Sequence, residues 1–137
     1  MKNLRNQCVI SDVALTQNLS IEFTIELTGE VLRLRNEQNK LPVAHVQYYG
    51  DDAHKGDELL YTSHDYPVKV SQAPIIKDRT HIPNRLPKEL ANEDKTGPDE
   101  IYALFYLTMQ LEVDGVEVDA LISEVVKSDT IIIKWPK

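Results

Sequence analysis

The chain has 137 residues, of which 42% are hydrophobic and 27% charged, the size and composition of one ordinary globular domain. We therefore expect a single domain over residues 1–137. No apolar run approaches the roughly 20 residues that a membrane-spanning helix needs, and the first residues lack the apolar region of a secretory signal. These observations predict a cytoplasmic protein without membrane segments.

The single cysteine and the distribution of charge argue against further classes. Cys8 cannot form an internal disulfide or a multi-cysteine zinc site, and its neighbours Val9 and Ile10 indicate a small buried side chain. The formal net charge is -7, and residues 91–137 hold ten acidic against four basic side chains. Because phosphate neutralisation dominates nucleic-acid binding, this balance argues against a general nucleic-acid binder.

Alternation of apolar and polar residues predicts strands in the first half of the chain. Apolar side chains occupy every second position from Ile21 to Leu27, which is the period of a strand with one buried face. Gly29-Glu30 then fits a two-residue type II′ turn, so residues 21–35 are expected to form a hairpin. Further strands are expected at 43–49, 58–62, 68–71 and 75–82, with Tyr66-Pro67 as a bend.

The second half contains a helical segment and an ambiguous one. Pro87 suits the first position of a short helix through Asn92. Residues 98–107 begin like a helix at Pro98, whereas the alternation that continues to Val113 indicates a strand from about residue 102. We expect the strand.

The chain closes with a predicted hairpin and a final strand. Asp114-Gly115 predicts a type I′ turn because both residues tolerate a positive φ, with a return strand over 116–122. A last strand is expected at 130–135, with Ile131, Ile133 and Trp135 facing inward.

Together these elements predict a mainly β fold, an antiparallel β sandwich or barrel of about seven to nine short strands with one or two short helices. The alternative is an α+β fold, in which a helix at 86–92 or 98–107 packs on an antiparallel sheet.

The turn at Asp114-Gly115 allows the register of its hairpin to be predicted. If Val113 pairs with Val116, then Glu112 lies opposite Glu117, and Gln110 opposite Asp119. Directly opposed carboxylates destabilise a sheet, which indicates either an exposed face that discourages aggregation or a partner with positive charge. Carboxylate oxygens could bind Ca²⁺, but their spacing matches no EF-hand loop, and we expect no metal site.

A basic segment stands out in this acidic chain and consists of Lys77, Arg79, His81, Arg85 and Lys88. A histidine base between guanidinium groups is the minimum that a metal-independent nuclease needs. A solvated, proline-rich connection that pairs with the acidic last third explains the same residues, and we favour that interpretation.

Other side chains point to recognition rather than chemistry. Tyr48, Tyr49 and Tyr66 lie among carboxylates that would repel phosphate, so they suit protein contacts better than nucleic-acid stacking. His45 is expected to be a hydrogen-bonded structural residue. The chain has no nucleophile elbow, phosphate loop or dinucleotide fingerprint, and we expect no cofactor.

We therefore expect a non-catalytic protein-binding or assembly module, such as an accessory or structural protein of a virus or mobile element. Its candidate contacts are the tyrosines above and the acidic hairpin over residues 109–120, which carries Glu112, Glu117 and Asp119. Self-association is one form of this hypothesis, with residues 77–88 of one copy meeting the acidic hairpin of another. Two alternatives stay open: a small nuclease or hydrolase centred on His81, and an inhibitor whose acidic face imitates nucleic acid.

Overall fold

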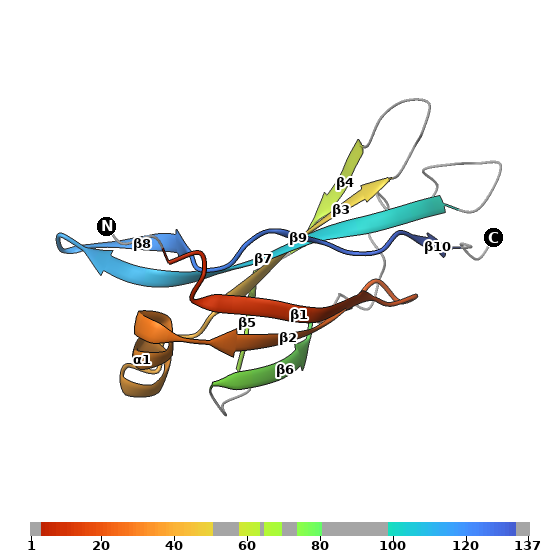
Figure 1. Ribbon diagram of the computed structural model, residues 1–137. Helices are drawn as coiled ribbons and strands as arrows, with labels where there is room; N and C mark the ends of the chain where they lie inside the picture. Colours follow the sequence, from red (N-terminus) through yellow and green to blue (C-terminus); the bar gives the residue numbers. More distant parts are fainter. Residues whose placement is uncertain (1–3, 51–57, 64, 70–73, 81–98, 134–137) are drawn as a thin grey trace.

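The computed structural model describes residues 4–50, 58–63, 65–69, 74–80 and 99–133 (Figure 1). Within these ranges the chain forms one helix, α1 (Gly29–Glu37), and ten strands: β1 (Cys8–Leu15), β2 (Ile21–Leu27), β3 (Val43–Gly50), β4 (Glu58–Thr62), β5 (Tyr66–Pro67), β6 (Ile75–Arg79), β7 (Asp99–Val113), β8 (Val116–Leu121), β9 (Val126–Lys127) and β10 (Ile131–Ile133). The predicted mainly β, antiparallel fold is confirmed. The strand number exceeds the prediction because three unpredicted strands are present: β1 and the two-residue strands β5 and β9.

The strands form two antiparallel sheets (Figure 1). The smaller sheet has the strand order β1-β2-β6. In the larger sheet, β7 and β3 lie side by side at the centre, and β4 and β5 pair with the other edge of β3. Strands β8, β9 and β10 pair one after another with the other edge of β7. The 15 residues of β7 therefore connect most of this sheet.

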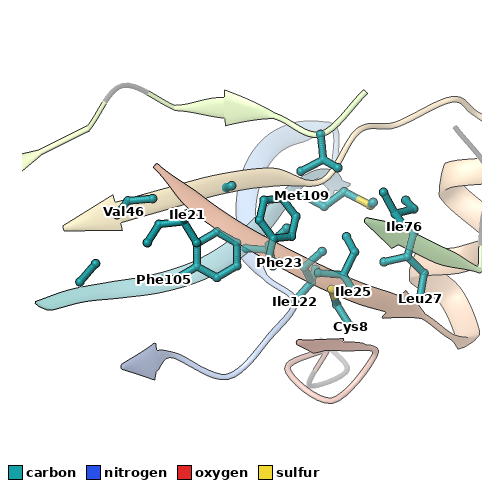
Figure 2. Packing of buried hydrophobic residues seen from close by; sticks show 14 of the residues in the cluster. Cys8, Ile21, Phe23, Ile25, Leu27, Val46, Ile76, Phe105, Met109 and Ile122 are labelled. Atoms are coloured by element: carbon teal, nitrogen blue, oxygen red, sulfur yellow. The ribbon is translucent and has the colours of Figure 1, made fainter. Parts of the chain in front are cut away.

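The hydrophobic core lies between the two sheets. The alternating apolar residues of β2 point into it, and each is at most 3% exposed: Ile21, Phe23, Ile25 and Leu27. They meet the inward-facing residues of β7, and the ring centroids of Phe23 and Phe105 lie 4.8 Å apart (Figure 2). The N–H of Cys8 also donates to the carbonyl of Ile122 at 3.1 Å, which joins the sheets through the backbone.

The hairpin predicted over residues 21–35 is wrong, because β2 is followed by α1. Val31 and Leu34, three residues apart, share the buried face of the helix, and Arg35 is buried beside them. Arg33 instead faces solvent, where it pairs with Glu30 and Glu37 one turn away on either side. The apolar residues of this segment thus follow the helical period rather than the strand period that the predicted hairpin required.

A distant side chain stabilises the start of this helix. Thr28, at the N-cap position, makes no capping bond with its own side chain to the helix. The Gln7 carboxamide takes this role, because its Oε1 accepts the N–H of Val31 at 3.1 Å. Gly29 has a φ of +58° and lies against the same carboxamide, so glycine provides both the conformation and the space.

The middle of the chain differs from the prediction in detail. Tyr66 and Pro67, expected as a bend, pair with Ala44 and Val43, whereas Val68 and Lys69 of the strand predicted at 68–71 lie outside any strand. Val68 is instead fully buried, and its N–H donates to the Pro42 carbonyl at 2.7 Å. The expected strand at 75–82 is present as β6, while residues 81–82 and the helix predicted at 87–92 lie outside the described residues.

The expected strand beyond residue 102 is confirmed, and the helical alternative at 98–107 is wrong from Asp99 onward. Every residue of β7 is paired with a neighbouring strand on at least one edge, and this pairing overrides the helix-start signal at Pro98. Besides β5, two strands were not predicted. One is β9, which is very short, and the other is β1, whose alternation is broken by a bulge where Asp12 has a φ of 54°. The final strand, predicted at 130–135, is present over residues 131–133, and residues 134–135 lie outside the described residues.

The return segment that follows β7 contains two irregularities, and a serine occupies each. Thr108 pairs with Leu121 and Phe105 with Val126, so three steps along β7 correspond to five on the return segment. Near this irregularity, the Ser123 hydroxyl accepts the N–H of Leu107 at 2.9 Å.

Ser128 repeats this arrangement further along β7. Its hydroxyl accepts the N–H of Ala103 at 2.8 Å, and its own N–H donates to the Ala103 carbonyl at 2.8 Å. Ser128 is 5% exposed, and Ser123 is fully buried. The two hydroxyls therefore supply acceptors where the backbone ladder of β7 is interrupted.

Candidate protein-binding surface

The acidic hairpin has the predicted register. Asp114 and Gly115 form its turn with φ values of 53° and 82°, as a type I′ turn requires. Val113 pairs with Val116, and the pairs continue through Glu112 and Glu117 to Met109 and Ala120. The hairpin lies at the end of the larger sheet, away from β4 and β10 (Figure 1). This register places alternate side chains of the hairpin on two opposite faces.

One face of the hairpin is acidic and open to water. Glu112 and Glu117 lie directly opposite each other, and Asp119 is opposite Gln110 on the same face. All three carboxylates belong to exposed residues. None of the ion pairs in the described part of the chain involves them. No cation that the structure describes therefore forms a close ion pair with these carboxylates to offset their mutual repulsion.

The other face of the hairpin is apolar and borders a groove. Leu111 and Val113 of β7 line this groove of about 520 Å³ together with Leu34 of α1 and Leu4. Polar and charged side chains also line it: Glu30, Arg33, Gln38, Lys40 and Glu112. On the return strand, Val116 is 61% exposed at the tip of the hairpin. An apolar surface therefore continues from the groove to the end of the hairpin.

A second groove of about 470 Å³ lies beside Asp119. A cluster of three polar side chains lines it: His45, Asp65 and Thr108. His45 Nε2 is 2.8 Å from the Thr108 hydroxyl, and its Nδ1 is 3.1 Å from the Asp65 carboxylate. The imidazole also stacks on Tyr106 with ring centroids 4.9 Å apart. His45 thus makes a hydrogen bond through Nε2 and a close contact with a carboxylate through Nδ1, in keeping with the structural histidine that we expected.

The order of carboxylate, imidazole and hydroxyl in this cluster resembles a nucleophilic triad, but its surroundings do not. Acyl transfer needs free N–H groups near the hydroxyl to stabilise an oxyanion. Thr108 lies inside the sheet, where it pairs with Val43 on one side and Leu121 on the other. Its backbone is therefore engaged in the sheet, and the cluster fits a structural role.

The three predicted contact tyrosines do not form one surface. The prediction that Tyr48 contacts a partner is wrong. Tyr48 is completely buried, and its hydroxyl donates to the Leu19 carbonyl, so it cannot contact a partner. The strand period of β3 contains the signal that we missed, because Tyr48 shares the inward face with Ala44 and Val46. Tyr49 is half-buried on the opposite face and stacks on Tyr102 at 5.4 Å.

Tyr66 lies elsewhere, beside the smaller sheet. Its hydroxyl is 3.5 Å from the Asp78 carboxylate. Burial, followed by the negative charge and hydrogen bond of Asp78, raises the pKa of the Tyr66 phenol. Tyr66 therefore remains a neutral hydrogen-bond donor at physiological pH and packs partly against the core.

Only part of the basic segment falls within the described residues. Lys77 and Arg79 are exposed on β6, on the same face of the smaller sheet. The Arg79 guanidinium pairs with Glu22 of the neighbouring strand. His81, Arg85 and Lys88 lie outside the described residues, so the alternative in which a base and two cations converge there is not tested.

No protein-family model matches the sequence, and a search of curated proteins finds no relative. The described part of the chain has no helix long or apolar enough to cross a membrane. In the same ranges, no three His, Cys, Asp or Glu side chains gather closely enough to hold a metal ion.

Proposed function

We propose that this protein is a non-catalytic protein-binding or assembly module, of the accessory or structural kind found in viruses and mobile elements, that binds through its acidic hairpin. The observation that supports this function is the direct opposition of Glu112 and Glu117 on an exposed strand pair. Such an arrangement costs stability, and a cationic partner would relieve the repulsion. A cytoplasmic location belongs to this proposal and is supported by the single, unbridged Cys8.

The alternative of a nucleic-acid-imitating inhibitor has less support. It requires the acids of the last third to gather on one face. Glu100 and Asp114 lie near the two ends of β7, and at about 3.3 Å per residue this separates them by about 45 Å. Glu124 is moreover paired with Arg5 at 3.0 Å. A nuclease centred on His81 is weakened in turn by the pairing of Arg79 with Glu22.

The experiment compares capture of partners by three forms of the full chain. The neutralised variant carries Glu112→Gln, Glu117→Gln and Asp119→Asn. The control variant carries Asp12→Asn, Glu26→Gln and Glu100→Gln, which remove the same charge from exposed residues elsewhere. We expect an extract of the native source to yield a protein that wild type and control retain, that high salt releases, and that the neutralised variant loses.

The same experiment excludes unfolding as the reason for a loss. The neutralised variant should be at least as stable as wild type in urea, because an opposed carboxylate pair has been removed. Equal capture by both variants would contradict the proposed function. Sedimentation at low and high salt tests self-association separately, and a monomer under both conditions excludes that form of the function.

A further inference from the structure

Strand β8 has an open edge on which another strand could form hydrogen bonds. Among the described residues, β8 pairs with β7 alone. Val113 and Val116 flank a two-residue turn, so they form a hydrogen-bonded pair, and bonded and non-bonded pairs alternate from there. The backbone N–H and C=O groups of Glu117 and Asp119 therefore point away from β7, toward the open edge.

The two faces beside this edge differ in chemistry. Glu117 and Asp119 lie on the acidic face with Glu112, whereas Val116 and Val118 lie on the apolar face. Successive side chains of any strand added to this edge would fall on these faces in turn. Every second residue would meet carboxylates, and the residues between would extend the apolar surface that reaches the groove beside α1.

We propose that the occupant of this edge is an extended segment of another protein in which basic and apolar residues alternate, and that it adds to β8 as a further antiparallel or parallel strand. This proposal rests on the proposed function and names the chemistry of the partner. Backbone hydrogen bonds would provide affinity, and the alternating side chains would provide specificity. Lys or Arg on the acidic face would also neutralise the opposed carboxylates.

A second copy of β8 is a poor occupant of this edge. Antiparallel pairing of two β8 strands would bring the Glu117 and Asp119 carboxylates of both copies onto one face. Like charges opposed across strands are destabilising, and here the repulsion already present between Glu112 and Glu117 would increase. Charge complementarity therefore selects a basic segment and disfavours symmetric self-pairing.

The test uses two synthetic peptides of identical composition with blocked ends. In one peptide Lys and Val alternate, and in the other the Lys residues precede the Val residues as a block. We expect the alternating peptide to bind wild-type protein at least about tenfold more tightly in fluorescence anisotropy, because it alone can place every side chain on its matching face. When the peptide binds, amide exchange should slow at Glu117 and Asp119. The exchange rate of Val118 should change less, because its N–H is already hydrogen-bonded to β7.

Two substitutions at Asp119 separate the edge from the charge. Asp119→Asn removes the carboxylate and keeps the outward N–H, whereas Asp119→Pro also removes that N–H without removing a bond to β7. We expect Asp119→Pro to lose binding that Asp119→Asn partly retains. If the proline variant does not fold, the comparison of the two peptides on wild-type protein still tests strand addition to β8.

The outcomes distinguish strand addition to β8 from the more general proposed function, protein binding through the acidic hairpin. Equal affinity for the two peptides would show attraction by charge alone, which leaves the proposed function standing and overturns strand addition. Failure of both peptides to bind, with a partner captured as described above, would also overturn it. A dimer in sedimentation that disappears with Lys77→Gln and Arg79→Gln would identify β6 of a second copy as the occupant and overturn the proposal.

Discussion

The Cys8 thiol is 2% exposed, and its burial raises its pKa from 9.0 to about 12. In the unfolded chain the thiol loses its proton near pH 9, whereas the folded protein keeps it. The contribution of Cys8 to the free energy of unfolding is therefore complete below pH 9 and declines as pH rises toward 12. The Cys8 thiol thus contributes to the pH dependence of stability above pH 9.

Comparison with Cys8→Ala measures this effect, because other titrating groups are common to both proteins. In urea denaturation, the stability advantage of wild type over Cys8→Ala should shrink by about 1 kcal/mol between pH 9 and pH 10. The native thiol should also resist a thiol reagent at neutral pH until the protein unfolds. A difference in stability that stays constant from pH 8 to pH 10 would contradict the assigned burial.

Residue types with a single strong preference were the easiest to predict. Asp114-Gly115 determined a turn and through it a complete register, because both residues accept a positive φ. The burial of Cys8 followed from its apolar neighbours. Tyr48 was harder, since tyrosine is common both in cores and at interfaces, and only its position among the inward-facing residues of β3 distinguishes the two.

At the scale of elements, the return segment beside β7 depends on Ser123 and Ser128. Replacing either serine by alanine leaves a buried backbone N–H of β7 without its acceptor, that of Leu107 or of Ala103. We expect each substitution to cost about 1–3 kcal/mol of stability. Ser11→Ala on the exposed face of β1 is the control and should change stability by less than about 0.5 kcal/mol.

Amide exchange shows whether each hydroxyl acts where the structure places it. Ser123→Ala should accelerate exchange at Leu107 more than at Ala103, and Ser128→Ala should do the opposite. Unchanged protection of Leu107 in the Ser123→Ala variant would mean that the N–H has another acceptor.

Elements whose ends depend on distant contacts were not predictable from local patterns. The start of α1 is stabilised by Gln7, which is 24 residues from Val31 in the sequence. From the local sequence alone, Gly29-Glu30 fits a hairpin turn as well as it fits the start of a helix. Similarly, Pro98 suggested a helix, and only the pairing of β7 with β3 and β10 favoured the strand there. Local preference is a weak guide where tertiary contacts supply the missing hydrogen bonds.

At the scale of the whole molecule, alternation identified the class of fold but not the division into two sheets. The alternation in a strand such as β2 indicates which of its faces is buried, but it does not indicate which strand pairs with it. The order β1-β2-β6 joins segments separated by about half the chain, and no local pattern encodes that pairing. The acidic hairpin was predictable because its partner strands are adjacent in sequence.

The two sheets share one core, so we expect them to unfold together. Phe23 of the smaller sheet packs on Phe105 of the larger one at 4.8 Å, and both are nearly fully buried. Phe23→Leu should lower stability by about 1–2 kcal/mol, since it removes apolar surface worth about 0.8 kcal/mol per methylene. Native-state amide exchange at Ile25 and at Leu107 should then lose protection by the same free energy, whereas Val9→Ala on the exposed face of β1 should leave both unchanged. A loss confined to Ile25 would show that the smaller sheet opens independently, which the Cys8–Ile122 backbone bond and the common core argue against.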